Sequence, residues 1–176
     1  MKIIYEEKGK KIIDNGDTIT KIIIETRNPK TGSYRIAHID DNWFKCYQEI
    51  YERYRFTPRL YSFKSDTFVM EKIKGVPIGT LHKNEYKRDY YKIISKLFKI
   101  LSSLYEYNIN NSDRWFWHCD TVSKNFMWDG NNLTLIDPEA WCWIDLDLLT
   151  KLDLPDKILS SAYSFENLKH TQKWTF

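Results

Sequence analysis

The N-terminal part of the chain carries apolar residues in short runs that are typical of β-strands. Such runs cover Lys2–Glu6, Lys11–Asp14 and Thr18–Glu25. Asn15-Gly16 separates the second run from the third and favours a tight turn, because it accepts a positive φ at low cost. These patterns predict an antiparallel meander, and a further strand is predicted at Tyr34–Ile39.

Apolar residues at helical spacing predict two helices. The first begins at Asp40 or Asp41, either of which can cap it, and ends before Thr57-Pro58. The second covers about Glu85–Tyr107. Its predicted buried stripe consists of Tyr90, Ile94, Leu97, Phe98, Leu101, Leu104 and Tyr105. Two more strands, Arg59–Phe63 and Thr67–Ile73, are predicted between the helices.

The rest of the chain is predicted to be mostly helical with one hairpin. A polar loop is predicted at Asn108–Arg114, the hairpin strands at Phe126–Trp128 and Leu133–Ile136, and a last helix near Leu154–Tyr163. This order of elements predicts an α+β fold of two lobes with a cleft between them. Residues 1–74 form the β-rich lobe and residues 75–176 form the helical lobe in this prediction.

Composition narrows the class of protein. Hydrophobic residues make up 42% and charged residues 29% of the chain, which suits a folded domain. The net charge is only +3 with the signs interspersed, so nucleic acid is not an expected partner. No apolar run is long enough for a membrane span or a signal peptide, and we expect a cytoplasmic protein. Frequent Ile, Lys, Asn and Tyr are typical of an AT-rich genome, viral or bacterial.

Three oxygen-bearing side chains flank the predicted hairpin. Asp120 and Asn125 precede it and Asp137 follows it. Because the hairpin folds back, we expect Asn125 and Asp137 to lie side by side, as two hard oxygen ligands that suit Mg²⁺. Asp120 would then lie a short distance away, where it could accept a proton from a hydroxyl group. The alternative is that these residues only cap the turns of an ordinary hairpin.

The pattern His118-x-Asp120-x-x-x-x-Asn125, with a hairpin and then Asp137, resembles the catalytic and metal-binding loops of the protein-kinase-like superfamily. That superfamily includes protein kinases, aminoglycoside and choline kinases and small atypical kinases. The resemblance implies an ATP- and Mg²⁺-dependent transfer of the γ-phosphoryl group to a hydroxyl of a protein Ser/Thr or of a small molecule. It assigns Asp120 as catalytic base, Asn125 and Asp137 as metal ligands, and His118 as a support for the loop.

A second stretch resembles the two strands that lead into a kinase hinge, Thr57–Tyr61 followed by Thr67–Gly75. In the family, Met70 would be the gatekeeper, and the backbone of Glu71 and Ile73 would hydrogen-bond adenine. The alternative is an edge hairpin that enters a loop.

The N-terminal lobe departs from the family pattern. It has no GxGxxG motif, so phosphate binding by a glycine-rich loop is not expected. The resemblance implies a lysine over the phosphates, for which Lys21 is preferred; a competing register places His38 there instead. Glu49 is the candidate for the helix glutamate that pairs with this lysine, while Glu52 suits a solvated helix face.

The sequence after Asp137 departs from the protein-kinase pattern, which leaves a second function open. Pro138-Glu139 stands where protein kinases have Phe-Gly, an ending that also resembles small-molecule kinases. The short helical lobe implies an open site or one that a protein partner completes. The rival is a non-catalytic, nucleotide-binding pseudokinase that acts as a protein-binding effector, in a host cytoplasm if the protein is viral.

Overall fold

The computed structural model describes residues 1–7, 10–23, 39–64, 66–81, 83–110 and 114–145. His38, the helix predicted near Leu154–Tyr163 and all but the last residue of the strand predicted at Tyr34–Ile39 lie outside these ranges. The chain forms two compact units. Unit 1 comprises Met1–Ile73 and Pro138–Cys142, and unit 2 comprises Lys74–Asp137 and the chain from Trp143 onward.

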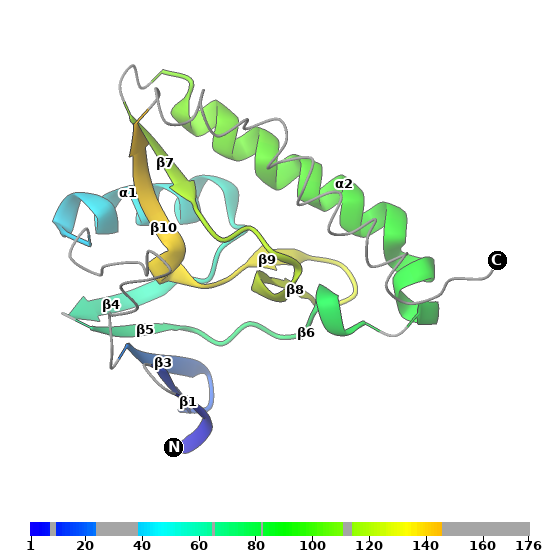
Figure 1. The fold of residues 1–176 in the computed structure, drawn as a ribbon, viewed down its shortest axis with the longest axis horizontal. Coiled ribbons are helices and arrows are strands. Elements are labelled where there is room, and N and C mark those ends of the chain that lie inside the picture. The colour runs from blue at the N-terminus through cyan, green and yellow to red at the C-terminus, as the bar shows by residue number, and fades with distance from the viewer. Residues whose placement is uncertain (8–9, 24–38, 65, 82, 111–113, 146–176) are drawn as a thin grey trace. The chain divides into compact units, whose positions relative to one another are not determined.

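Unit 1 contains a five-stranded antiparallel sheet in the order β1-β2-β3-β5-β4 (Figure 1). Its strands are β1 (Lys2–Glu7), β2 (Lys10–Asp14), β3 (Thr18–Ile23), β4 (Leu60–Lys64) and β5 (Thr67–Glu71). The predicted meander is confirmed, and β5 adds to β3 with Ile19 opposite Met70 and Lys21 opposite Phe68. Cross-strand partners share a face of the sheet, so Lys21, Phe68 and Met70 all lie on one face.

Helix α1 (Asp41–Tyr54) packs on this sheet through its apolar side. The Asp40 carboxylate accepts a hydrogen bond from the Trp43 N–H at 2.7 Å, so Asp40, one of the two predicted candidates, is the N-cap. The Trp43 ring stacks on Tyr47 with ring centroids 5.3 Å apart and meets Phe68 edge-on at 6.2 Å. The periodic aromatic stripe of the helix therefore forms the core of unit 1.

A short returning segment completes unit 1. It consists of the 3₁₀ turn η4 (Pro138–Ala140) and the start of β10 (Trp141–Asp145). Trp141 is fully buried, and its ring lies 5.8 Å from that of Tyr47. The Trp141 carbonyl also accepts a hydrogen bond from the Trp43 indole at 2.8 Å. This packing fixes the chain directly after Glu139.

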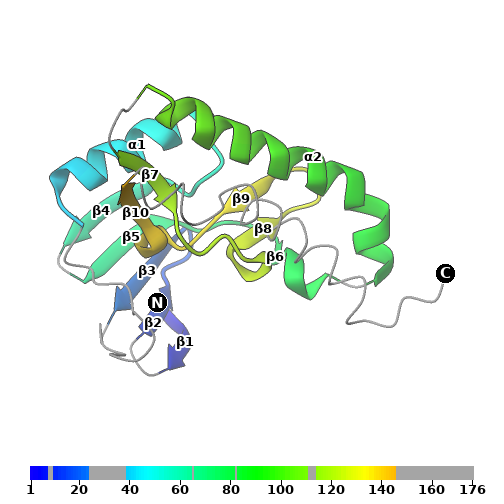
Figure 2. The same cartoon turned by 45° about the horizontal axis from the view of Figure 1, so that its top comes forward.

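Unit 2 is built on the long helix α2 (Lys83–Asn108), which contacts β7 (Arg114–His118) and β9 (Leu133–Leu135) (Figure 2). A three-stranded sheet has the order β6-β8-β9, with β6 at Val76–Pro77 and β8 at Phe126–Trp128. Strand β7 pairs with β10. Two 3₁₀ turns, η2 (Ile78–Thr80) and η3 (Ser123–Asn125), complete the unit.

The structure corrects two details of the sequence prediction in unit 2. The buried face of α2 comprises Ile93, Leu97, Ile100, Leu101 and Leu104. Phe98 and Tyr105, which the predicted stripe included, are about half exposed. Strand β7 was not predicted, because its run of three aromatic residues shows no alternation of apolar and polar positions. None of the helices in the described part of the chain is long and apolar enough to cross a membrane.

Candidate functional site

His118, the last residue of β7, links two loops of unit 2. Its Nε2 atom lies 2.9 Å from the Ile136 carbonyl oxygen, and its Nδ1 atom lies 3.3 Å from the Asp120 backbone nitrogen. A carbonyl only accepts and a peptide N–H only donates, so the ring is neutral with its proton on Nε2. Burial of the ring lowers the pKa of His118 to about 4. A neutral imidazole thus ties the Asp120 backbone to the residue before Asp137.

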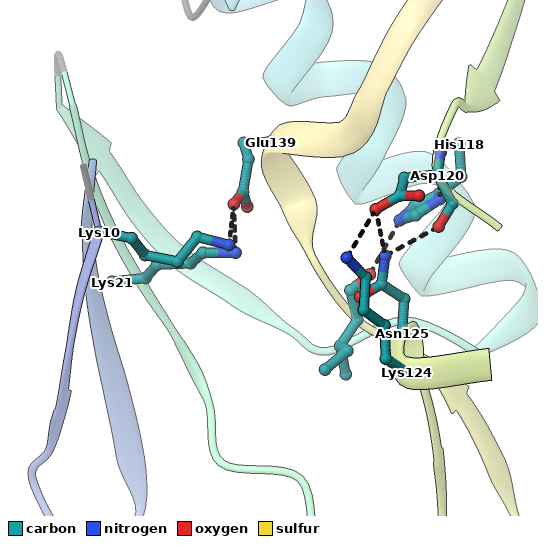
Figure 3. A network of polar contacts seen from close by, with 8 residues as sticks. Lys10, Lys21, His118, Asp120, Lys124, Asn125 and Glu139 are labelled. Atoms are coloured by element: carbon teal, nitrogen blue, oxygen red, sulfur yellow. Dashed lines mark hydrogen bonds and ion pairs between the residues drawn. The ribbon is translucent and has the colours of Figure 1, made fainter. Parts of the chain in front are cut away.

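Asn125 holds the side chain of Asp120. The two donors of its Nδ2 group bond the Asp120 carbonyl at 2.8 Å and the Asp120 Oδ2 atom at 2.9 Å (Figure 3). The exposed Lys124 ammonium lies 3.6 Å from the same carboxylate oxygen. The Asp120 side chain is 27% exposed, so the carboxylate that these contacts hold is still open to solvent.

The hairpin places Asn125 next to the chain that leads into Asp137. Phe126 pairs with Leu135, and the Ile136 N–H donates to the Asn125 carbonyl at 2.8 Å. Asp137 has a φ of 77°, a left-handed conformation that few residues other than glycine adopt. The backbone therefore brings the positions of Asn125 and Asp137 together at one end of the hairpin.

The donor set of this hairpin end fits Mg²⁺. Both hydrogens of the Asn125 amide are directed at Asp120, so the amide oxygen is the atom that can face a cation. Asn125 and Asp137 would offer two hard oxygen atoms, and Mg²⁺ commonly takes its remaining ligands from phosphate and water. Within the described ranges, no group of three His, Cys, Asp or Glu side chains could hold a metal by itself.

A second polar cluster lies in unit 1. Lys21 on β3 is only 3% exposed and forms an ion pair with Glu139 of the returning segment. Lys10 on β2 lies 3.0 Å from the same Glu139 oxygen, Oε1 (Figure 3). Sequence reasoning did not find this use of Glu139, although the Asp-x-Glu spacing at Asp137 was a visible signal.

Glu49, the carboxylate that was expected to pair with Lys21, lies on the exposed surface of α1. Its side chain is 50% exposed, and its carboxylate is 4.0 Å from the Lys45 ammonium one helical turn away. Glu52 is exposed as well and pairs with Arg55, as expected for a solvated face. Glu139 provides a carboxylate against Lys21. Glu49 is not on the aromatic stripe that α1 turns toward the sheet.

The hinge candidates lie at the end of β5. Met70 is buried on the same face of the sheet as Lys21. The Glu71 N–H donates to the Arg59 carbonyl at 2.8 Å, and the Lys72 N–H donates to the Asp17 carbonyl at 3.1 Å. Any contact of Glu71 with adenine would therefore use its carbonyl oxygen.

The sequence matches no protein-family profile and no curated protein sequence. Solved structures with a similar fold include the Rio2 kinase–ADP/Mg²⁺–phosphoaspartate complex from Chaetomium thermophilum, at 15% identity and a TM-score of 0.53, covering 97% of this chain and 55% of that one. The PknI kinase domain of Mycobacterium tuberculosis is 11% identical with a TM-score of 0.45, covering 79% of this chain and 57% of that one. The Plasmodium vivax ethanolamine kinase is 14% identical with a TM-score of 0.43, covering 82% and 56%.

This chain spans a little more than half the length of each of these proteins. The likeness to the Rio2 structure confirms the predicted fold class, an α+β protein-kinase-like fold.

Proposed function

We propose that this chain is a Mg²⁺-dependent phosphotransferase that moves the γ-phosphoryl group of ATP to a hydroxyl group. One observation carries the proposal: His118 and Asn125 hold Asp120 next to the hairpin end that leads into Asp137. A fixed and accessible carboxylate, beside two hard oxygen ligands, meets the main requirements of metal-assisted transfer to a hydroxyl. The protein-kinase-like fold supports the same class of reaction.

In this proposal Asp120 is the catalytic base. Its carboxylate would orient the acceptor hydroxyl and take its proton, while Asn125 keeps the carboxylate in one orientation. The Asn125 amide oxygen and the Asp137 carboxylate would hold Mg²⁺, which when bound supplies positive charge to the phosphate oxygens. His118 stays neutral and positions the loop.

Lys21 would contact the phosphates of ATP. Its burial and its ion pair with Glu139 support this role, because a buried lysine needs a partner that keeps it charged. The carboxylate expected of Glu49 would thus be supplied by Glu139. Met70 would pack against adenine, and the Glu71 carbonyl and the Ile73 peptide would hydrogen-bond its edge.

The acceptor is proposed to be a Ser or Thr of a protein, or a hydroxyl of a small molecule. The same proposal includes a protein partner that completes the short helical lobe. It also includes a cytoplasmic location, in a host cell if the protein is viral.

The second candidate function is a non-catalytic, nucleotide-binding effector. The missing GxGxxG motif favours it.

Asp120→Asn separates these two functions. The amide keeps the size of the side chain but cannot act as a base, so transfer should fall by about 10²–10⁴-fold while Mg-ATP affinity stays near that of the wild type. Binding is measured by calorimetry and transfer with labelled ATP, using cell extract, the protein itself and a panel of sugars and amino alcohols. Asp17→Asn, at an exposed turn, is the matched control.

Three outcomes are informative. Loss of transfer with retained binding in Asp120→Asn alone supports the enzyme. Wild-type protein that binds Mg-ATP but transfers nothing favours the binding protein. Wild-type protein that is folded and binds no nucleotide overturns both functions.

A further inference from the structure

Helix α2 carries a second apolar stripe, on a different side from its buried face. Its members follow one another at alternating spacings of four and three residues, the spacing of helices that pack against each other in coiled coils. Tyr91 is 83% exposed, Phe98 and Ile109 are 53% exposed, and Tyr105 is 51% exposed. Large exposed apolar side chains in one row are typical of an interaction surface. This outer stripe consists of Tyr91, Ser95, Phe98, Ser102, Tyr105 and Ile109.

Large and small side chains alternate along the outer stripe. Two exposed serines, Ser95 and Ser102, lie four residues after Tyr91 and Phe98, one helical turn away on the same side. Each of these rings therefore has a shallow place next to it. A facing helix fills such places best if it presents rings opposite the serines and serines opposite the rings.

The outer stripe is complementary to itself in one arrangement. Two copies of α2 can run antiparallel, with a twofold axis at the level of Ile100. Every ring then faces a smaller side chain of the second copy, whereas a parallel pair in register would place rings on rings and serines on serines. The facing pairs are Phe98 with Ser102, Tyr105 with Ser95 and Tyr91 with Ile109.

Contacts within unit 2 already orient two of the rings. Tyr105 meets Trp115 edge-on with ring centroids 5.4 Å apart, and Tyr91 meets Tyr90 edge-on at 5.3 Å. A side chain that is already oriented loses less conformational freedom when a partner covers it. This favours association through the outer stripe.

Charges beside the outer stripe match in the same antiparallel arrangement. Lys92 and Glu106 are exposed and lie on one side of the stripe, directly after Tyr91 and Tyr105. The twofold axis brings Glu106 to the level of Ile94 of the second copy, about 3 Å along the helix from Lys92. The axis repeats this contact, so two pairs of opposite charge form. A carboxylate has several acceptor positions, so the pairing does not require Glu106 to lack other contacts.

We propose that two copies of this chain associate through the outer stripe, with one α2 antiparallel to the other. The stripe is about 27 Å long and about 10 Å wide, so it buries about 300–500 Å² on each copy, whereas a stable interface buries about 800 Å². The exposed Lys99 side chains of the two copies lie beside the stripe near the axis, and their repulsion opposes the contact. The dimer is therefore weak and depends on concentration. The inference goes beyond the proposed function and does not depend on it, because it rests on α2 alone.

The first test measures the mass of the full chain by sedimentation equilibrium, from about 1 µM to about 1 mM. The wild type should change from monomer to dimer as the concentration rises. Phe98→Ala should weaken the dimer by about 10-fold or more, because both copies lose a ring from the middle of the contact. Tyr61→Ala is the matched control, since Tyr61 on β4 is also half exposed, at 50%, and should leave the association unchanged. A thermal melt of each variant checks that it is folded.

Further variants test the antiparallel arrangement. Ser102→Phe enlarges the side chain that faces Phe98 of the second copy, so it should weaken the dimer although it adds apolar surface. Lys92→Glu and Glu106→Lys should each weaken the dimer by about 3- to 30-fold, because each brings two pairs of like charges together. The double variant restores opposite charges and should associate as the wild type does.

A wild type that stays monomeric up to about 1 mM would overturn the inference and leave the proposed function standing. Equal association of Phe98→Ala and Tyr61→Ala would show that the outer stripe is not the contact. Tighter association of Ser102→Phe, or a double charge variant that is no better than the single ones, would contradict the antiparallel arrangement. A monomeric wild type that binds vesicles of anionic phospholipid would assign the stripe to a membrane surface instead, which also overturns the inference.

Discussion

The side-chain amide of Asn108 hydrogen-bonds both peptide groups of Phe116. Its Oδ1 atom accepts from the Phe116 N–H at 2.6 Å, and its Nδ2 group donates to the Phe116 carbonyl at 3.0 Å. The same Nδ2 group also bonds the Leu104 carbonyl in the last turn of α2 at 2.7 Å. The amide thus takes the place of a neighbouring strand and fixes β7 to the end of α2, two residues before His118.

Asn108→Leu is expected to destabilise the protein. The substitution leaves the peptide groups of Phe116 without their side-chain partner in a fully buried place, at a cost of about 2–4 kcal/mol in the free energy of unfolding. Denaturant unfolding measures the loss. Asn110→Leu, at an exposed position two residues later, is the control and should change stability by less than about 0.5 kcal/mol. Equal midpoints for the two variants would contradict the structural role of Asn108.

The Asp89 carboxylate links α2 to strand β8 and should make the protein sensitive to acid. It accepts hydrogen bonds from the Arg88 side chain at 3.0 Å and from the Trp128 indole at 3.1 Å, and these bonds lower the pKa of Asp89 to about 2 from an ordinary value of 3.8. A lowered pKa stabilises the folded state above pH 3.8, and this stabilisation is lost as the pH falls toward 2.

In Asp89→Asn the amide oxygen can still accept from Trp128, but the side chain no longer titrates. The variant should therefore lose less stability than the wild type between pH 4 and pH 2. Unfolding in urea at a series of pH values gives the change of the free energy of unfolding with pH for the wild type and for the variant. Parallel slopes would mean that Asp89 has the same pKa in the folded and unfolded states.

Much of the fold could be predicted because its signals are local. Short apolar runs and the Asn15-Gly16 turn indicated the meander, and helical spacing indicated α1 and α2. Strand β7 could not be predicted, since its aromatic run has no period and both peptide groups of Phe116 bond the Asn108 side chain. Such a bond depends on tertiary structure and leaves no pattern in the sequence.

In the candidate site, too, the features with a local sequence signal could be predicted, and those that depend on tertiary contacts could not. The spacing of Asp120, Asn125 and Asp137 around a hairpin is visible in the sequence because the hairpin itself is local. The contact of Lys21 with Glu139 joins residues far apart in the chain. Isoleucine occupies both faces of β3, so the apolar pattern did not indicate that Lys21 would be buried.

The backbone of Asp137 provides a test of strain at the proposed metal site. Its φ of 77° costs an ordinary L-residue about 1 kcal/mol, whereas glycine adopts it freely. Asp137→Gly should thus be more stable than Asp137→Ala by about 1 kcal/mol, a comparison in which loss of the carboxylate cancels. Thermal melts measure this difference, and equal stability would argue against the left-handed conformation.

The same two variants test the proposed role of Asp137 in metal binding. Both lack the anionic ligand, so both should lose the part of ATP affinity that depends on Mg²⁺, whatever their stability. Calorimetry with and without Mg²⁺ separates that part. Unchanged Mg-ATP affinity in either variant would contradict the assignment of Asp137 as a ligand.

The neutral His118 ring should give the protein a second sensitivity to acid, at higher pH than that of Asp89. Its pKa is about 4 in the folded chain against an ordinary value of 6.5, because the buried ring resists taking a charge. Between these two values the unfolded chain binds more protons than the folded one, so stability rises with pH across this window and is lost as the pH falls through it. The free energy of unfolding can change by up to about 1.4 kcal/mol per pH unit in this window.

His118→Gln removes the titrating group while its amide can both donate and accept a hydrogen bond. At pH 7 the variant should be less stable than the wild type, because glutamine cannot reach both Ile136 and Asp120 with the geometry of the ring. Between pH 6.5 and pH 4.5 the wild type should lose stability and the variant should lose about 1–2 kcal/mol less. The slope is the decisive measurement, because a purely structural defect would lower both ends of the profile equally. A wild type and variant with the same slope would show that the pKa of His118 is the same in the folded and unfolded chains, so that burial would not keep the ring neutral in this pH window.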